Sequence, residues 1–458
     1  MKSYDLKPTF ENLLETYNRN VIGRNPDIFR FTEILDSVED GCSIALDGNW
    51  GSGKTFFVKQ VKMVMDAHNS FINHIEDDKI DEIVAVRNNH YRDKIFDLQP
   101  QVCVYYDAWE NDNDEDPVMS LVYAILSSVD TDFDFKDTNF IKIGASIMEV
   151  FSGRNWAQLI ENLKRTSPLG VLKEHKDVDI LVGEFLDSLI PEKGNRLVVF
   201  IDELDRCKPS YAVRLLERIK HYFSHDNITF VFSVNINELQ HTIRKHYGND
   251  FNGTRYLDRF FDLKVTLPPP NLQGYYSSLN FNDSHYTYDI VCGAVIKAYH
   301  FELREIAKYL RFTKIAAYAP THGNSYHFRS PEGMALHFCL LYIIPIMIGL
   351  NIYDTKKYTE FIGGRDYTPL VEIAKAQKMQ IFGELLNQNE TYDVQEANLI
   401  VVTLEDKLKA VYEALFVTTY GKEIDSIKIG EMQFDKSIKD TLLRTTGLLS
   451  QYTKLDMD

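Results

Sequence analysis

The chain has 458 residues, of which 44% are hydrophobic and 26% charged, proportions typical of soluble globular domains that exclude wholesale disorder. This length accommodates two or three domains of ordinary size. An excess of 67 Asp and Glu over 50 Lys and Arg gives a net charge of -17, which repels a nucleic-acid backbone over most of the surface and disfavours nucleic acid as the main partner.

The N-terminal stretch MKSYDLKPTFENLLETY lacks the apolar core that a signal peptide needs. The five cysteines are odd in number and widely spaced, which is typical of reduced thiols rather than of a disulfide framework. Both observations predict a cytoplasmic protein.

The first motif, SIALDGNWGSGKTFFVKQV, contains the pattern G-x-x-x-x-G-K-[ST] between an apolar strand and a helix with a buried face. Phosphate binding needs this context, because glycines let backbone N–H groups turn inward and the helix N-terminus adds positive potential. We expect Lys54 to reach the β- and γ-phosphates and the Thr55 hydroxyl to bind Mg²⁺. The residues predicted to bind the nucleotide are Gly48, Asn49, Trp50, Gly51, Ser52, Gly53, Lys54, Thr55 and Phe56. The alternative is a Gly-rich turn before an ordinary helix.

A second motif, RLVVFIDELDRC, ends a continuous apolar run over residues 197–201 with Asp202 and Glu203. Such a run is typical of a parallel strand that is covered on both faces. We predict that Asp202 takes part in Mg²⁺ binding and that Glu203 orients and deprotonates the attacking water. A strand that runs into an acidic turn is the alternative, and the phosphate loop upstream favours the catalytic interpretation.

A further apolar strand, ITFVFSV, is followed by Asn235. A polar side chain at this place can hydrogen-bond the lytic water or the γ-phosphate, so Asn235 is a candidate catalytic residue. An Asn at a strand end is equally a good turn former, and both interpretations stay open.

Four blocks together resemble the KAP family of P-loop NTPases, relatives of the AAA+ and STAND ATPases. They are GNWGSGKT, VYYDAWEND, FIDELDRCKP and YLDRFFDLKVTLPPP, in the family's order within residues 14–320. This chain has Asp202-Glu203 where the family usually shows Asp-Asp, and Asp107 where the second block usually has Asn. The Asp-Glu pair resembles active AAA+ enzymes and favours hydrolysis. Because residues 131–195 hold only short apolar pieces, the chain is similar to a soluble bacterial branch of the family.

This resemblance implies ATP and Mg²⁺ as cofactors and a homo-oligomer as the assembly. Arg259 matches the arginine that precedes the fifth strand in AAA+ proteins, where it would enter the site of a neighbouring subunit and neutralise transition-state charge. Arg255 is held in reserve for this role. The alternative is that Arg259 snorkels or pairs with Asp258 or Asp262.

Two further segments resemble parts of the family that touch nucleotide. Arg304, in FELREIAKYLRF, matches a lid arginine that contacts the γ-phosphate, although a solvated pair with Lys308 explains its position equally well. The segment NRNVIGRNPDIF resembles the part that closes over the adenine, which makes Val21, Ile22 and Arg24 weak candidates.

The predicted fold class is α/β, a P-loop NTPase parallel sheet with helices on both faces, followed by a helical lid and a C-terminal α-helical region. Strands are expected near residues 43–47, 101–107, 196–202, 228–234 and 262–267, and the ligand site at their carboxyl ends. The expected domains are an NTPase domain over 1–270 with a helical insertion at about 131–195, a lid over 271–330 and a helical domain over 331–458. The chain after Pro270 is predicted to be α-helical to its end, including DVQEANLIVVTLEDKLKAVYEALF.

The segment MALHFCLLYIIPIMIGLNIY, residues 334–353, is long enough to span a bilayer. It contains His337, Pro345 and Asn351 and stands alone, so we expect a buried helix of the C-terminal domain and no stable membrane insertion.

The leading functional hypothesis is an ATP-hydrolysing molecular switch coupled to oligomerisation, with a protein partner or effector and a role in anti-phage defence that rests on the family resemblance. A nucleic-acid motor or loader is an alternative that needs a basic, aromatic channel, for which KHYGNDFNGTRY is the candidate. A small-molecule kinase would need an arginine-rich lid, which the sequence lacks. A nucleotide-binding regulatory protein with little turnover is the remaining alternative.

Overall fold

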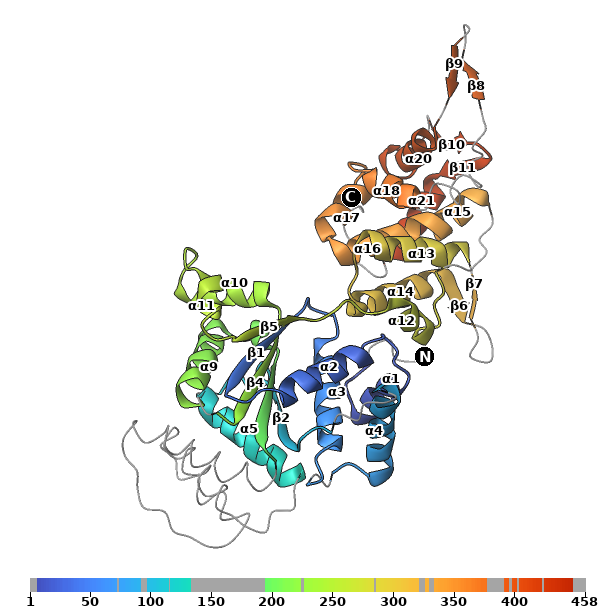
Figure 1. Ribbon diagram of the computed structural model, residues 1–458. Coiled ribbons are helices and arrows are strands. Elements are labelled where there is room, and N and C mark those ends of the chain that lie inside the picture. Colours follow the sequence, from blue (N-terminus) through green and yellow to red (C-terminus); the bar gives the residue numbers. More distant parts are fainter. Residues whose placement is uncertain are drawn as a thin grey trace. The chain divides into compact units, whose positions relative to one another are not determined.

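The chain forms two compact units in the computed structural model, one over Lys7–Gly274 and one over Tyr275–Asp458 with Met1–Leu6 (Figure 1). The structure describes residues 6–71, 74–91, 97–114, 116–132, 194–223, 226–283, 286–320, 326–328, 333–376, 391–394, 398–401, 403–421 and 424–447. The predicted insertion at 131–195 therefore lies almost entirely outside the described residues.

The N-terminal unit is built on a five-stranded sheet with the strand order β2-β3-β4-β1-β5, in which all pairs are parallel. The strands are β1 (Cys42–Asp47), β2 (Gln101–Asp107), β3 (Arg196–Asp202), β4 (Ile228–Val234) and β5 (Leu263–Thr266). Each lies within one residue of its predicted position at both ends. Strands β3 and β4 are buried along their whole length, which explains their uninterrupted apolar sequences.

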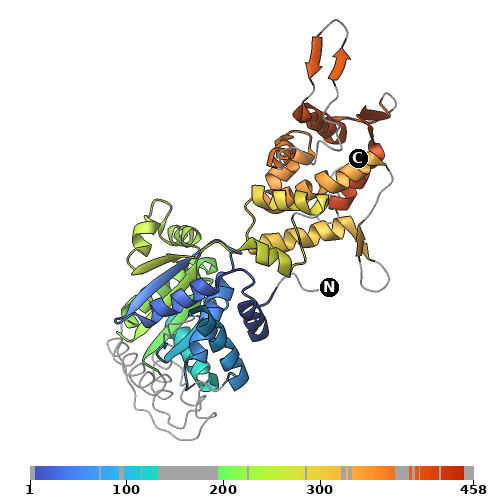
Figure 2. The ribbon, with the colours of Figure 1, turned by 45° about the vertical axis from the view of Figure 1, so that its right-hand side comes forward.

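Helices cover both faces of this sheet, as the two views agree (Figures 1 and 2). Their bounds are α1 (Phe10–Asn18), α2 (Asn25–Asp36), α3 (Lys54–Ala67), α4 (Asp77–Tyr91), α5 (Pro117–Asp132), α9 (Pro209–Tyr222), α10 (Ile236–Tyr247) and α11 (Gly253–Leu257). Helices α1 to α4 share one buried cluster with one face of the sheet, and α5, α9 and α10 share a second cluster with the other face. The predicted α/β fold is confirmed.

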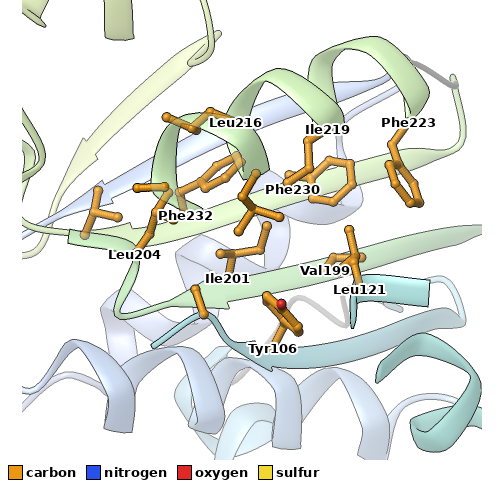
Figure 3. Packing of buried hydrophobic residues seen from close by; sticks show 14 of the residues in the cluster. Tyr106, Leu121, Val199, Ile201, Leu204, Leu216, Ile219, Phe223, Phe230 and Phe232 are labelled. Carbon is orange, nitrogen blue, oxygen red and sulfur yellow. The ribbon is translucent and has the colours of Figure 1, made fainter. Parts of the chain in front are cut away.

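Alternating residues of β3 supply the two clusters, because successive side chains of a strand point to opposite faces. Val199 and Ile201 lie in the second cluster, close to Tyr106 of β2 and to Leu216 and Phe232 (Figure 3). Val198 and Phe200 lie in the first cluster. Both faces of the central strands are thus held by packing. The polar residues at the strand ends are consequently carried on a rigid support.

In the ranges that the structure describes, the C-terminal unit is mainly helical but contains three short antiparallel hairpins. Its helices are α12 (Leu272–Ser278, which begins before the unit boundary), α13 (Thr287–Ala298), α14 (Leu303–Ala317), α15 (Met334–Phe338), α16 (Ile344–Tyr353), α17 (Thr355–Ile362), α18 (Thr368–Ala376), α20 (Leu404–Tyr412) and α21 (Lys436–Gly447), with π-helical turns η3 (Cys339–Ile343) and η4 (Glu413–Val417). The hairpins pair β6 (Tyr318–Pro320) with β7 (Tyr326–Phe328), β8 (Thr391–Val394) with β9 (Asn398–Val401), and β10 (Ser426–Ile429) with β11 (Met432–Asp435).

The prediction of an all-helical chain after Pro270 was therefore wrong in its extent. The segment predicted as packed helices begins in β8 and β9, and only from Leu404 onward does it form helix α20. The physical reason lies in the run Asn398–Val401, whose β-branched residues fit an extended, paired strand better than a helix.

The apolar segment Met334–Tyr353 forms one continuous helical stretch across α15, η3 and α16. Its 20 residues have a hydropathy of 2.0, so by length and composition it could cross a membrane, yet 72% of the most apolar window is buried inside the unit. Helices α13, α14, α17, α18 and α21 all pack against α16. The π-helical turn precedes Pro345, whose missing N–H disrupts the regular α-helical pattern there. The division of this unit at residue 330 into a lid and a further domain stays a prediction.

Candidate nucleotide site

Polar residues collect at the carboxyl ends of the central strands. Strand β4 lies between β1 and β3, and the register pairs Asp107 with Asp202 and Asp202 with Ser233. The phosphate loop starts at the same edge, because the Gly48 N–H donates to the Val234 carbonyl at 3.1 Å. The parallel sheet thus places the two sequence motifs side by side although 150 residues separate them.

The loop itself needs its glycines for different reasons. Gly51 and Gly53 have φ values of 84° and 93°, which residues with a Cβ rarely adopt. Gly48 has no positive φ, but a Cβ there would lie 3.0 Å from Ser52 Oγ. Gly53 leads directly into α3 without a side-chain cap, so the first N–H groups of this helix are available to an anion.

Lys54 is buried, and its ammonium group donates to the Gly48 carbonyl at 2.6 Å and the Asn49 carbonyl at 3.1 Å. Burial lowers the pKa of Lys54, and the charges of Asp205, Asp202 and Glu203 oppose this shift. The Lys54 side chain therefore bonds back to the carbonyls of its own loop. It also lies within the electrostatic field of the carboxylates of the acidic motif. Thr55 and Phe56 follow it, half-buried, in the first turn of α3.

Asp202 is 1% exposed, and both of its carboxylate oxygens are engaged. Oδ2 accepts from the Tyr105 hydroxyl at 3.0 Å, and Oδ1 accepts from the Glu203 N–H at 3.0 Å. Burial and the neighbouring carboxylate raise the pKa of Tyr105, so this hydroxyl stays a donor, and the Lys59 ammonium lies 4.1 Å from the centre of its ring. These contacts hold the Asp202 carboxylate in one orientation.

Glu203 adopts a left-handed backbone conformation, with φ 60° and ψ 23°, at the start of a short 3₁₀ turn (η2, Leu204–Arg206). A non-glycine residue in this region is uncommon and costs of order 1 kcal/mol or more, so the surrounding structure imposes it. Burial and the charge of Asp202 raise the pKa of Glu203 to about 7, and Arg206, which forms an ion pair with the Glu203 carboxylate, opposes the shift. A carboxylate with this environment can accept a proton near neutral pH.

Asp205, Arg206 and Trp109 lie near Glu203 and were not assigned a role from the sequence, whereas Trp50 was predicted to bind the nucleotide. The Trp50 indole N–H donates to Asp205 Oδ2 at 2.5 Å, and the Arg206 guanidinium carbon lies 5.8 Å from the centre of the Trp50 ring and 5.6 Å from that of Trp109. Asp205 is buried, and among the described residues its Oδ1 has no hydrogen-bond partner. The signal was in the quoted motifs, which contain these residues, but linear spacing does not show which side chains meet.

Asn235 is 9% exposed and caps helix α10. Its side-chain oxygen accepts from the N–H groups of Asn237 at 3.1 Å and Glu238 at 3.3 Å. The turn-forming role is therefore present, and it occupies the amide oxygen. Contact between Asn235 and the lytic water stays a prediction. Because the amide oxygen is occupied, such a contact would use the amide nitrogen.

Arg259 lies between α11 and β5 with an exposed side chain, and within the described parts of the chain its guanidinium has no ion-pair or hydrogen-bond partner. The acidic residues that were the alternative partners are engaged elsewhere: Asp258 pairs with Lys264, and Asp262 accepts from the Ser43 N–H at 2.8 Å. Arg255 is also exposed.

Arg304 belongs to the C-terminal unit, where it is exposed in the first turn of α14. A capping box of Glu302 and Glu305 starts this helix. The geometry within the unit leaves both interpretations of Arg304 open.

Arg24 is 3% exposed and joins the phosphate loop to the end of β5, because it donates to the Ser52 and Pro268 carbonyls at 2.8 Å each. The Asn271 N–H donates to the Ile22 carbonyl at 2.8 Å, so residues 21–24 run beside 268–271. Arg24 thus has a structural task, and contact of Val21, Ile22 or Arg24 with an adenine stays a prediction.

The sequence profile of the KAP family P-loop domain matches residues 24–282, more than half of the chain. This chain belongs to the KAP family. As a P-loop NTPase it is a nucleotide-binding protein, and residues 24–282 contain the phosphate loop, the acidic motif and Arg259.

Three further comparisons describe more distant likenesses. The uncharacterized protein MJ0182 of Methanocaldococcus jannaschii is 35% identical over 86 residues, which are 18% of this chain and 42% of that protein, less than half its length. The ORC2 protein of Aeropyrum pernix, solved as ADPNP and ADP complexes, shares 11% identity with a TM-score of 0.31 over 93% of this chain and 94% of its own. PCH-2 of C. elegans shares 11% identity with a TM-score of 0.20 over 82% and 71% of the two chains.

Proposed function

We propose that this KAP family member binds and hydrolyses ATP with Mg²⁺ at the carboxyl edge of its parallel sheet. One observation carries the proposal: Lys54 of the phosphate loop is buried within the electrostatic field of Asp202, Glu203 and Asp205, which come from a different strand end. A buried lysine of a phosphate loop held near carboxylates from the end of another strand is the arrangement that P-loop enzymes use for phosphoryl transfer to water.

The residues fit a nucleotide with its metal. The Thr55 hydroxyl and the oriented Asp202 carboxylate are hard oxygen donors of the kind that Mg²⁺ prefers. Two buried atoms, Ser52 Oγ in the loop and Asp205 Oδ1, have no hydrogen-bond partner within the described ranges, so they can bond to a polar ligand. When bound, Mg²⁺ supplies neutralisation of phosphate charge.

The chain's own groups would then divide the chemistry. Lys54 exchanges its carbonyl partners for phosphate oxygens, which is favourable because a charged acceptor makes the stronger hydrogen bond. Glu203 orients the water and takes its proton, a task that suits a carboxyl with a pKa near 7. Asp202 would help to hold the Mg²⁺ ion in place with its oriented carboxylate.

The same proposal extends to assembly. Arg259 is exposed, its guanidinium has no partner in the part of the chain that the structure describes, and it lies next to the edge strand β5, so it can reach a neighbouring molecule. We infer that copies of this chain associate when ATP is bound and that Arg259 completes the site of the next copy. The cycle would work as a cytoplasmic switch that acts on a protein partner, and the family resemblance suggests anti-phage defence as its setting.

A second candidate is a nucleotide-binding regulator with little turnover. The ion pair between Arg206 and Glu203 favours it, because an engaged carboxylate is a poorer base than a free one. Comparison of the wild type with Glu203→Gln separates the two candidates.

The deciding experiment measures molar mass by light scattering after size exclusion, with and without ATP and Mg²⁺, together with phosphate release. The variants are Arg259→Ala, Arg255→Ala and, as a matched control, Arg214→Ala, which removes an exposed arginine of α9. We expect an ATP-dependent oligomer whose turnover falls by about 10³-fold in Arg259→Ala alone. A monomer with equal turnover in all proteins would contradict the shared site and leave hydrolysis to a single chain.

A further inference from the structure

Arg206 makes three interactions in the described chain, one with the proposed base Glu203 and two with tryptophan rings. Its guanidinium pairs with the Glu203 carboxylate and lies over the rings of both Trp50 and Trp109. The side chain of Arg206 is 24% exposed and that of Glu203 19%, so the pair is shielded from solvent more than a surface salt bridge. Arginine suits this place because a planar guanidinium can stack on aromatic rings and still donate to a carboxylate.

The two tryptophans come from different parts of the site. Trp50 stands in the phosphate loop, and its indole N–H is bonded to Asp205, the residue before Arg206. Trp109 follows β2, where its backbone N–H donates to Asp107 Oδ1 at 3.1 Å. The loop and the end of β2 thus both contact the short segment that carries Glu203.

The exposure of these tryptophans is unusual for such large apolar side chains. Trp50 is 45% exposed and Trp109 53%, whereas tryptophan is highly buried on average. Packing of the core therefore does not account for them. Their common contact is Arg206, on which both rings are placed.

We propose that Arg206 is a positioning residue that sets the orientation of Glu203, and that Trp50 and Trp109 hold Arg206 in place. Because Trp50 belongs to the phosphate loop and bonds to Asp205, this arrangement links the loop to the base. Glu203 needs such support: its left-handed backbone is held by a turn of only three residues. The inference rests on the proposed hydrolysis and adds a residue to it.

The charged and titratable groups around this pair define what a variant changes. They are Asp202, Asp205 and Cys207 on the same segment, Tyr105 and Asp107 on β2, and Lys54 on α3. In the described chain, Arg206 is the cation that contacts the Glu203 carboxylate directly and so offsets its negative charge. Because most of the Arg206 side chain is covered, circular dichroism of each variant checks that it folds.

The test measures kcat and KM for ATP in Arg206→Ala, Arg206→Lys, Trp50→Phe and Trp50→Ala, with Arg214→Ala as the control. A displaced catalytic group costs up to roughly a hundredfold in rate, so we expect Arg206→Ala to lower kcat by about tenfold to a hundredfold with KM little changed. Arg206→Lys should recover part of the loss, because it keeps the charge but not the planar stacking. Trp50→Phe should lose less than Trp50→Ala, because it keeps the ring and loses only the bond to Asp205.

A double-variant comparison isolates the route of the effect. If Arg206 acts through Glu203, then Arg206→Ala combined with Glu203→Gln should be no slower than Glu203→Gln alone. Additive losses would overturn the proposal, as would an unchanged kcat in Arg206→Ala. A raised KM with unchanged kcat would make Arg206 a nucleotide contact, and a raised kcat would make it a brake; either result overturns positioning.

The outcomes separate this inference from the proposed function. Turnover in the wild type that is lost in Glu203→Gln and kept in Arg206→Ala would sink the positioning role and leave hydrolysis standing. A wild type without turnover would overturn both. The indole fluorescence of Trp50 and Trp109, followed in a Trp156→Phe background, adds a readout besides activity: ATP should change the emission, and Arg206→Ala should abolish most of that change.

Discussion

The interiors of the two units are built from different materials. The N-terminal unit buries many polar and charged side chains, among them Lys54, Asp202 and Asp205 at one edge of its sheet. The C-terminal unit buries aliphatic and aromatic side chains, and its buried polar residues in the described ranges are Thr313 and Lys407.

This difference has a physical meaning. Buried charges cost free energy unless they are paired or serve a ligand, so a cluster of them indicates a site. The buried tyrosines of the C-terminal unit instead bond to backbone carbonyls: Tyr288 to Thr313 at 2.8 Å, Tyr309 to Pro345 at 3.2 Å and Tyr412 to Phe361 at 2.8 Å. That interior stabilises a fold, and any role in binding a partner must come from its surface.

The largest effect on the proposed activity is expected from a change at Glu203 in the N-terminal unit. Replacement by Gln keeps the size of the side chain and removes its ability to take a proton, so we expect hydrolysis to fall by about 10²- to 10⁴-fold. Nucleotide affinity, measured with a fluorescent ATP analogue, should stay within about threefold because Lys54 and the loop are intact. Turnover equal to that of the wild type would contradict the role of Glu203, and Glu217→Gln on α9 serves as the control.

A cavity in the C-terminal unit should act on stability instead. Ile346 is fully buried in α16, and its replacement by Ala should lower the free energy of unfolding by about 2–5 kcal/mol. Urea unfolding followed by circular dichroism measures the loss. Ile315→Ala, at a residue that is 42% exposed, should change the same quantity by less than about 0.5 kcal/mol. Equal effects of the two variants would contradict the burial of α16.

The Tyr105 hydroxyl should affect the affinity of the site for Mg²⁺, because it bonds to Asp202. Tyr105→Phe removes the donor to Asp202 Oδ2, and loss of such an outer-shell bond lowers metal affinity by roughly 10- to 100-fold. A Mg²⁺ titration of ATP hydrolysis should therefore shift to higher concentration. Tyr123→Phe, at a tyrosine of α5 that is 59% exposed, is the matched control, and identical titrations for the two variants would refute the orienting role.

The smallest effect is expected at a helix cap of the C-terminal unit. The Thr403 hydroxyl accepts from the Asp406 N–H at 3.1 Å and starts α20 with a capping box. Thr403→Ala should lower the free energy of unfolding by about 1 kcal/mol, while Thr403→Ser should keep most of it. Thermal unfolding of both variants measures this, and an alanine variant as stable as the serine variant would show that the cap contributes nothing.

The sequence determined the strands of the sheet and the presence of a phosphate loop. An apolar run such as residues 197–201 is typical of a strand that is buried on both faces, and the glycines at 51 and 53 allow backbone conformations that other residues avoid. Both signals are local, so they can be recognised without knowledge of the fold. The hairpin at 391–401 could not, because a short paired strand depends on a partner that periodicity does not reveal.

The tertiary structure decided which side chains meet. Trp50, Tyr105 and Arg206 stand in three separate motifs, and only the strand order, with β4 between β1 and β3, sets the distances among them. It also decided that Asn235 caps a helix and that Arg259 stays unpaired in the described chain, since the acidic neighbours of Arg259 bond elsewhere. Residue types declare which chemistry is available, but contacts between distant segments depend on the packing of the whole sheet, and that information is not local.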